Sequence, residues 1–420
     1  MKKVYFTLSC VFLLSVFAGC SKMGDAGTNA GKGDPAPQRE LHLKMLADNV
    51  GYLGAGAETE QGYYYIVTSE DMTHSNIRFI DKQTKEDVFL CSNPGCEHNA
   101  DSCTSYISLA NSYSPELVCL EDKLVLFFPG INGEDVQIKP HIDVLNLDGT
   151  DRKTCCTFEA NQEYSDGVAG QGGELYLLVS TYTEEGSKTE LVRIDVQEGK
   201  TQGIAEVEPP CFLLGAYENF VVLKSLGNSV FSEGFDPAVI PNGETAYLQQ
   251  QHQVFTVDVT TGATQTVSAW QQDMCKEFMA GENLFLITQP DKQLQVTLRN
   301  CATGEEKAFA IGKEVETLAD VTALLYHNGF FIFELIEGYQ ESGALLVHQY
   351  AYDLNSGALT QIELYDPVRN YPLTIEGTLG EDIVLKNLLY SGEDESSYVG
   401  QELVVYKWQD YLNSVWNGQK

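Results

Sequence analysis

Dense runs of apolar residues recur along the chain, each starting directly after a short polar turn. The runs are rich in β-branched, aromatic and aliphatic residues, which predicts strands that are buried on both faces. Seven such runs begin at Tyr63, Lys123, Glu174, Asn219, Asn283, Gly329 and Asp382. Their mean spacing is about 53 residues, which is close to the period of a β-propeller blade.

A second pattern follows each of the middle runs by some tens of residues. It consists of an Asp or Asn, two or three further residues and a Gly, which together favour a hairpin turn. Clear copies are Asp195–Gly199, Asp258–Gly262, Asn300–Gly304 and Asp353–Gly357, and looser forms are Asp81–Lys85 and Asn146–Gly149. We expect each copy to mark the turn between the third and fourth strands of one unit.

Seven units of about four strands, with no amphipathic helix between them, predict an all-β fold. The interpretation is a seven-bladed β-propeller of four-stranded antiparallel blades, and the repeat is also compatible with six or eight blades. A solenoid of stacked β units is the alternative. The unit length varies along the chain, which suits blades with loops better than regular coils.

The two ends of this repeat region suggest how the ring closes. Residues 41–46 alternate apolar and polar side chains, as in a half-buried strand, and they precede the first full unit. The last unit ends after its third strand, near residues 401–407. The residues that follow have apolar side chains at helical spacing. We therefore expect residues 41–46 to pair with residues 401–407, so that the N-terminal strand closes the ring.

The first twenty residues have the pattern of an export signal. Lys2 and Lys3 precede an apolar stretch, residues 4–18, that is too short for a permanent membrane span. The stretch ends in Phe17-Ala18-Gly19-Cys20, which resembles the bacterial lipobox, although Phe17 replaces the usual Leu. We expect lipidation at Cys20, and an ordinary cleaved signal is the alternative. The predicted organisation is a signal peptide (1–19), a lipidated cysteine with a flexible tether (20–40) and a propeller (41–420).

Charge limits the partners of this protein. The 420 residues include 60 Asp and Glu against 26 Lys and Arg, a formal net charge of -34. Such a field repels nucleic acid and anionic lipid headgroups, so we expect membrane attachment through the N-terminal lipid alone. The expected location is the extracytoplasmic face of the cell membrane.

Long segments between the strands are expected on one face of the ring, where the second and third strands of each blade connect. They are Ser225–Gln251, Pro129–Pro140, Thr181–Glu190, Glu337–Gly343 and Ser391–Gly400. Variable loops on a rigid scaffold are where binding usually occurs. This face is therefore the candidate contact surface for a protein or carbohydrate ligand.

One segment carries metal-ligating residue types at close spacing. Cys91, Cys96, His98 and Cys103 have the form C-x4-C-x-H-x4-C and follow the first blade, on the face expected to hold the long loops. Three thiols and an imidazole form a known structural zinc set. An exported chain also favours disulfides, and without Cys10 and Cys20 nine cysteines remain, an odd number. The sequence therefore leaves three alternatives for this segment: a structural zinc site, a disulfide, or free thiols.

This cysteine segment and the propeller repeats together resemble a group of uncharacterised lipoproteins from anaerobic gut bacteria. Members of that group carry a similar segment after their first blade, so the resemblance implies a propeller fold and a lipid-anchored location. The turn Asn146-Leu147-Asp148-Gly149-Thr150 resembles one in the propeller of TolB-like periplasmic proteins. Neither resemblance implies an activity.

The chain lacks the sequence motifs of several enzyme classes. It contains no G-x-S-x-G elbow, no H-E-x-x-H and no phosphate-binding glycine loop. Three tryptophans are too few for the one-per-repeat pattern of quinoprotein propellers. We therefore assign no catalytic residue and expect a ligand-binding or protein-interaction module. The alternative is a carbohydrate-active lyase or hydrolase that uses carboxylates at the mouth of the ring.

Overall fold

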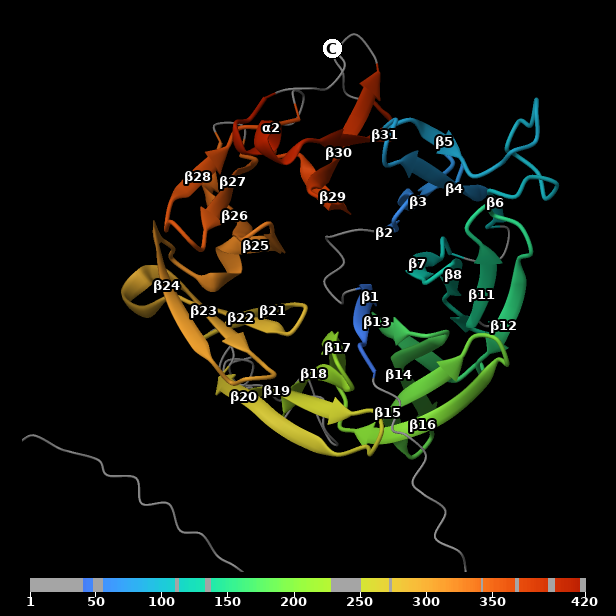
Figure 1. Cartoon of the computed structure of the whole chain (residues 1–420), viewed down its shortest axis with the longest axis horizontal. Coiled ribbons are helices and arrows are strands. Elements are labelled where there is room, and N and C mark those ends of the chain that lie inside the picture. Colours follow the sequence, from blue (N-terminus) through green and yellow to red (C-terminus); the bar gives the residue numbers. More distant parts are fainter. Residues whose placement is uncertain are drawn as a thin grey trace, which may run out of the picture. The chain divides into compact units, whose positions relative to one another are not determined.

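Seven antiparallel blades form a ring, as the repeats predict (Figure 1). The computed structural model describes residues 41–47, 56–109, 113–132, 137–227, 251–271, 274–340, 343–366, 370–391 and 397–415. The predicted signal peptide, Cys20 and the tether lie outside these ranges. No helix among the described residues is long and apolar enough to cross a bilayer.

Blades 1 to 4 follow one another along the chain. Blade 1 contains β2 (Gly56–Glu58), β3 (Gly62–Thr68), β4 (His74–Asp81), β5 (Asp87–Phe89) and β6 (Tyr106–Ser108). Blade 2 contains β7 (Glu116–Leu120), β8 (Lys123–Phe128), β11 (His141–Asn146) and β12 (Lys153–Thr157), with a small hairpin of β9 (Ile131–Asn132) and β10 (Gln137–Ile138). Blade 3 contains β13 (Gln162–Gln171), β14 (Glu174–Thr183), β15 (Gly186–Asp195) and β16 (Lys200–Val207). Blade 4 contains β17 (Cys211–Tyr217), β18 (Phe220–Gly227), β19 (Gln251–Asp258) and β20 (Thr264–Gln271).

Blades 5 to 7 complete the ring. Blade 5 contains β21 (Lys276–Ala280), β22 (Asn283–Thr288), β23 (Gln293–Asn300) and β24 (Glu306–Glu314), with the 3-10 turn η2 (Pro290–Lys292). The turn η3 (Leu318–Asp320) leads to blade 6, which contains β25 (Val321–His327), β26 (Phe330–Tyr339), β27 (Leu345–Asp353) and β28 (Leu359–Ile362). Blade 7 contains β29 (Thr374–Leu379), β30 (Asp382–Ser391) and β31 (Ser397–Tyr406), followed by helix α2 (Trp408–Leu412).

The sequence patterns fall on equivalent positions of the blades. Every dense apolar run becomes the second strand of a blade, which is flanked by neighbours in its own sheet and packed on both sides. Every Asp/Asn-to-Gly signature becomes the turn between the third and fourth strands. In one copy, Asp258 Oδ1 accepts hydrogen bonds from the backbone N–H of Thr260 at 2.8 Å and of Thr261 at 3.2 Å, and Gly262 has a φ of 72°. Both predictions are confirmed.

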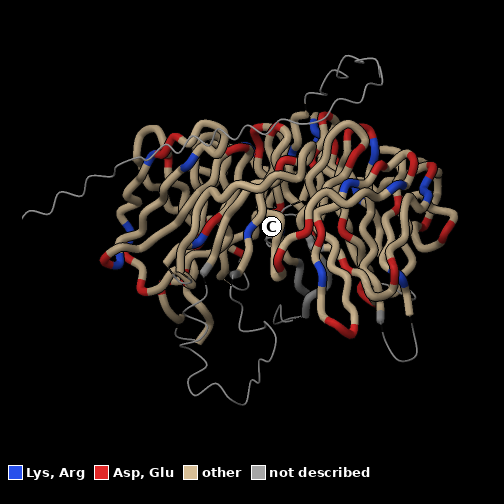
Figure 2. The backbone as a smooth tube through the Cα atoms, turned by 90° about the horizontal axis from the view of Figure 1, so that it is seen from below, with Lys and Arg blue, Asp and Glu red and all other residues tan. Residues whose placement is uncertain are grey.

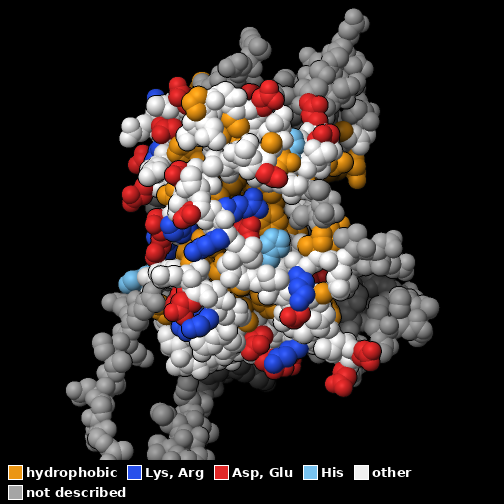
Figure 3. Space-filling model, turned by 90° about the vertical axis from the view of Figure 1, so that its right-hand side faces the viewer, with side chains coloured by type: hydrophobic (Ala, Val, Ile, Leu, Met, Phe, Trp, Pro, Cys, Tyr) orange, Lys and Arg blue, Asp and Glu red, His pale blue; other side chains and the backbone are white. Residues whose placement is uncertain are grey.

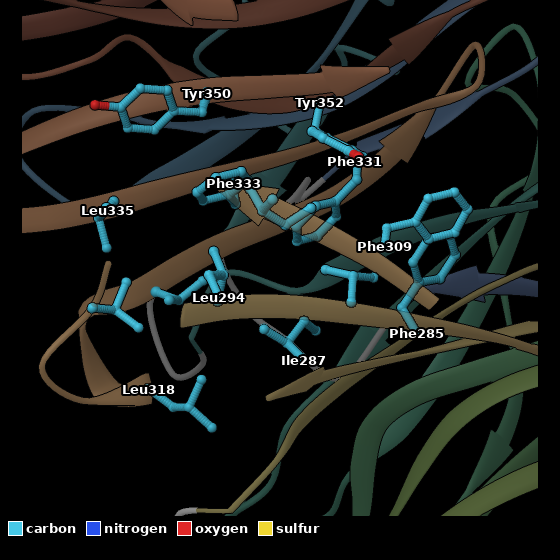
Figure 4. Close-up of a cluster of buried hydrophobic side chains, with 14 of the residues drawn as sticks. Phe285, Ile287, Leu294, Phe309, Leu318, Phe331, Phe333, Leu335, Tyr350 and Tyr352 are labelled. Atoms are coloured by element: carbon cyan, nitrogen blue, oxygen red, sulfur yellow. The ribbon is translucent and has the colours of Figure 1, made fainter. Parts of the chain in front are cut away.

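The hydrophobic core is divided among the blade interfaces. The buried apolar side chains of the described residues form seven clusters, and each cluster lies between one pair of neighbouring blades. The cluster between blades 5 and 6 contains many aromatic rings, including Phe285, Phe331 and Phe333 (Figure 4). Each blade is therefore held by side-chain packing on its two neighbours.

The expected closure of the ring by the N-terminal strand is wrong. Strand β1 (Lys44–Ala47) pairs with β13 of blade 3, where it adds a fifth, innermost strand (Figure 1). Residues 401–407 belong mainly to β31, whose partner in the described part of blade 7 is β30. The alternation in residues 41–46 correctly indicated one buried face. It carried no information on which blade that face covers, and Leu43 packs into the cluster between blades 3 and 4.

Blades 7 and 1 meet instead through side chains. Their interface buries Tyr63, Leu379, Val384 and other apolar residues. Lys85 Nζ lies 2.7 Å from the Asp382 carboxylate, and the Tyr63 hydroxyl donates to the carbonyl of Glu376 at 2.8 Å. The ring therefore closes by packing and polar contacts between blades rather than by strand exchange.

The two faces of the ring differ. The short-turn face holds the turns between first and second strands and between third and fourth strands. The long-hairpin face holds the connections between second and third strands and those from one blade to the next. Residues 181–190 are not a loop there, because β14 and β15 run to a tight turn at Thr183 and Gly186. The side view shows acidic residues spread over both edges of the ring (Figure 2).

Candidate metal centre

The cysteine segment is an insertion in the outermost strand of blade 1. β5 and β6 both pair with β4, at Arg78–Ile80 and at His74–Asn76 respectively, so they form two halves of one interrupted strand. Residues 91–104 leave the sheet between them and project from the outer rim of the ring (Figure 1). This position differs from the expected one on the long-hairpin face, because the chain returns to pair with β4 before it crosses to blade 2.

Hydrogen bonds hold the two ends of the insertion together on β4. The backbone N–H of Leu90 donates to the carbonyl of Ile77 at 3.0 Å, and the N–H of Ile77 donates to the carbonyl of Ser105 at 2.9 Å. Thr104 Oγ1 donates to the carbonyl of Leu90 at 2.7 Å. The insertion thus leaves and re-enters the sheet at one point, which brings Cys91 and Cys103 close together.

The four predicted ligand residues converge. The three sulfur atoms and one ring nitrogen of Cys91, Cys96, His98 and Cys103 all lie within 4.8 Å of one another. Cys103 is buried and the other three are half-buried. None of the three sulfurs is in a disulfide in this structure. These four residues are called the Cys3His cluster below.

Several contacts orient His98 toward the sulfurs. Its Nδ1 lies 3.2 Å from Cys103 Sγ, and its ring stacks on Phe89 with centroids 4.2 Å apart. The buried side chain of Asn76 donates to the carbonyl of His98 at 2.9 Å and to Ser105 Oγ at 3.1 Å. His98 also has a φ of 57°, a conformation that costs a non-glycine residue free energy and that the surrounding contacts maintain.

Backbone N–H groups point at the sulfurs. Burial works against ionisation of Cys91, but hydrogen bonds from the N–H groups of Asn93 and Thr104, together with the neighbouring thiols, lower its pKa to about 7. The N–H of His98 likewise favours the Cys96 thiolate, although burial and the nearby sulfurs leave the pKa of Cys96 above its usual value. Three thiolates this close repel one another, so a cation between them would favour their joint ionisation.

The six remaining cysteines lie in or beside strands and differ in environment. Burial raises the pKa of Cys119 and Cys301 to about 11 and of Cys211 and Cys275 to about 12. Cys155 and Cys156 are neighbours on β12, and their mutual hydrogen bond lowers the pKa of the first and raises that of the second. Only the Cys3His cluster combines three thiols and an imidazole in the described residues.

The sequence indicated which residues could bind a metal ion, but not the residues that hold them in place, Asn76 and Ser105. Asn76 and Ser105 belong to β4 and to the return of the insertion, and nothing in their local sequence signals a role. The outer side of the ring that faces the viewer in Figure 3 carries charges of both signs among scattered apolar side chains. The cluster is therefore distinguished by its ligand geometry rather than by a charged patch.

Comparisons with known proteins are limited to the fold. No protein-family model matches the chain, and no curated protein matches it. The acylaminoacyl peptidase of Pyrococcus horikoshii has a similar structure, with a TM-score of 0.51 and 12% identity over 88% of this chain and 52% of that chain. The present chain thus spans about half the length of that peptidase.

Two further solved structures show lower similarity. An oligogalacturonate lyase in complex with manganese has a TM-score of 0.48 and 11% identity over 86% of this chain and 90% of that chain. TolB from Acinetobacter baumannii has a TM-score of 0.36 and 9% identity over 70% of this chain and 62% of that chain. At 12% identity the likeness to the peptidase concerns the fold alone, and these two lower-scoring structures add no argument.

Proposed function

We propose that this protein is a lipid-anchored, extracytoplasmic binding module whose long-hairpin face contacts the ligand. The observation that supports this face is the distribution of exposed apolar side chains. Eight large hydrophobic side chains are exposed among the described residues. Six of them lie on the long-hairpin face or on the strand ends that form it: Met72, Tyr113, Tyr182, Met274, Tyr339 and Leu345. These side chains are spread around the ring, so they mark the face as a whole rather than one patch, and exposed Tyr side chains are common in interaction surfaces.

The entry point of the chain supports an orientation for this module. In β1, Lys44 pairs with Gly170 and Ala47 with Val168, so β1 runs antiparallel to β13 and begins at the short-turn face. The backbone N–H of Leu43 donates to the carbonyl of Glu218, in a turn of that face. The described chain therefore enters the ring at the short-turn face, on the side opposite the proposed contact face.

The chemistry of the ligand follows from charge and side-chain type. A net charge of -34 disfavours anionic partners, and exposed Tyr side chains suit both protein surfaces and the apolar faces of sugar rings. A neutral or basic protein, or a neutral glycan, fits these properties. Nucleic acid does not.

Ion pairs weaken the enzymatic alternative. On first strands of two blades, the Glu277 carboxylate pairs with Lys224 and the Glu376 carboxylate pairs with Lys386. Burial raises the pKa of Glu277, and its contact with Lys224 opposes that shift. The first ion pair joins blades 4 and 5 and the second joins β29 to β30 within blade 7, which favours a structural role over glycoside cleavage.

Cell fractionation tests the anchor. The wild-type protein should remain with the membrane fraction and carry the mass of an acylated N-terminal cysteine, whereas Cys20→Ala should abolish both. The matched control is Cys10→Ala, which lies inside the predicted signal and should change neither. A Cys20→Ala variant that stays lipid-modified would contradict the proposal.

Site-specific photocrosslinking on intact cells tests the contact face. A photoreactive phenylalanine analogue at Tyr339 should yield a discrete crosslinked species, and the same analogue at Glu198 on the short-turn face should not. A panel of purified polysaccharides incubated with the protein tests the alternative. Binding without cleavage would support the module, and turnover that copurifies with the wild-type protein would overturn it.

A further inference from the structure

The Cys3His cluster has the donor set of a closed tetrahedral metal site. In a zinc site with Zn–S bonds of about 2.3 Å, tetrahedral geometry places neighbouring ligand atoms about 3.8 Å apart. The four ligand atoms here lie within 4.8 Å of one another. Displacements of less than about 1 Å would bring them to bonding distance of one central ion.

The surroundings prearrange these atoms as ligands. The hydrogen bonds from Leu90 N–H to Ile77 and from Thr104 Oγ1 to the carbonyl of Leu90 hold the two ends of the insertion together, which keeps Cys91 and Cys103 side by side. Stacking on Phe89 and the 3.2 Å approach of Nδ1 to Cys103 Sγ orient the imidazole, so that Nδ1 faces the sulfurs. Asn76 donates to the backbone carbonyl of His98 and to the side-chain hydroxyl of Ser105, which ties the cluster to β4. Such outer contacts hold first-shell ligands in position.

A disulfide explains fewer of these features. It would join two sulfurs, leave the third thiol without a partner and give the oriented imidazole no role. A metal ion uses all four side chains at once.

We propose that Cys91, Cys96, Cys103 and His98 Nδ1 bind one Zn²⁺ ion in a closed structural site. Binding releases the thiol protons to solvent, and the neutral imidazole keeps its remaining proton on Nε2. Four protein ligands leave no open position for substrate, so the ion fixes the insertion on the rim of blade 1 and takes no part in catalysis. Zinc fits better than magnesium or calcium because thiolate ligands are soft.

Metal analysis of the full-length protein tests this proposal. The protein is purified under anaerobic conditions without chelator, and metals are measured by mass spectrometry. The expected result is one zinc ion per chain. After removal of zinc, added Co²⁺ should give the visible absorption bands of a tetrahedral cobalt–thiolate complex.

Variants separate this site from adventitious binding. Cys96→Ser should lower the bound zinc at least tenfold, while Cys119→Ser, which alters a half-buried thiol of neighbouring β7, should leave one ion bound. His98→Cys supplies a fourth sulfur and should retain the ion, whereas His98→Ala should weaken binding. Circular dichroism checks that each variant retains its strands.

Four outcomes would overturn the proposal. The first is an anaerobically purified chain without metal. The second is a mass 2 Da below that of the reduced chain, with the bond mapped to two of these cysteines. The third is iron–sulfur absorption in place of zinc. Equal zinc content in Cys96→Ser and Cys119→Ser would also refute the assigned ligands.

Discussion

The insertion in blade 1 and the interface between blades 5 and 6 are held together by different physical means. Between blades 5 and 6, Phe285 and Phe331 stack with centroids 6.3 Å apart, and Phe333 packs beside Phe331 at 5.1 Å (Figure 4). These rings are completely buried. The insertion has no comparable apolar cluster, and four ligand atoms converge there instead. Stability at the interface follows the buried apolar area, whereas order in the insertion depends on ligands and hydrogen bonds.

This difference predicts how far the destabilising effect of a mutation extends through the structure. Blades 5 and 6 each pack on two neighbours, so a defect in their shared core weakens the ring. The insertion joins the ring through β5 and β6, each of which pairs with β4 at three positions, and through the hydrogen bond from Asn76 to His98. A mutation in the insertion should therefore destabilise the insertion and its pairing with β4 rather than the whole ring.

The largest expected effect is that of Phe331→Ala. Removing a completely buried ring leaves a cavity, which should lower the free energy of unfolding by about 3–5 kcal/mol. Urea denaturation measures this change, and the zinc content of the native protein should stay the same. A loss below about 1 kcal/mol would contradict the view that this core holds the ring.

The second effect concerns pH and the carboxyl group of Glu334, which lies between Phe333 and Leu335 on β26. Burial raises its pKa to about 7, and hydrogen bonds from Gln349 and Tyr371 act in the opposite sense. The folded state therefore binds more protons than the unfolded state between about pH 4.5 and pH 7, so this group makes stability fall as pH rises through that range, by up to about 3 kcal/mol.

Glu334→Gln isolates that contribution, because glutamine retains a hydrogen-bond acceptor but does not titrate. Wild-type and variant proteins should have similar unfolding free energies near pH 4, and the variant should be the more stable of the two above pH 7. Chemical denaturation across this pH range provides the measurement. Parallel pH profiles for the two proteins would show that Glu334 titrates normally.

Cys103→Ser should have a smaller effect on global stability, of about 1 kcal/mol, because only the short β4–β6 pairing depends on the insertion. Hydrogen exchange should nevertheless show loss of protection at residues 106–108 but not at residues 330–339. Zinc removal by a chelator should reproduce this pattern in the wild-type protein. A decrease in unfolding free energy as large as that of Phe331→Ala would make the cluster part of the global core.

The smallest effect is expected for Tyr339→Ser on the long-hairpin face. This side chain is 75% exposed, so its loss should change the free energy of unfolding by less than about 0.5 kcal/mol. The thermal unfolding midpoint checks this expectation. A large decrease would indicate that Tyr339 supports the hairpin rather than serving as an exposed contact residue.

The fold was predictable to the extent that it depends on local patterns. Runs such as residues 123–128 required a strand buried on both faces, and turns such as residues 258–262 required a hairpin whatever surrounded them. Closure was not predictable. The alternation in residues 41–46 specifies one buried face but not the blade that this face covers, and only packing of the whole ring selects the position beside β13.

The candidate site was predictable to a similar degree. Cys91, Cys96, His98 and Cys103 stand close together in the sequence, so their types and spacing suggested a ligand set. The residues that hold these four in position were not predictable. Asn76 lies on a strand that the sequence separates from the cluster, and its two hydrogen bonds exist only because β5 and β6 pair with the same β4.

The sequence by itself therefore favoured seven blades, and it determined the position of each second strand and the identity of the four candidate ligands. These properties depend on residue type and short spacing, through apolar periodicity, turn conformation and sulfur chemistry. The tertiary structure alone decided which blade takes the N-terminal strand, how blades 7 and 1 close the ring, and where the insertion lies. Those choices depend on the relative free energies of alternative long-range packings, to which every blade contributes.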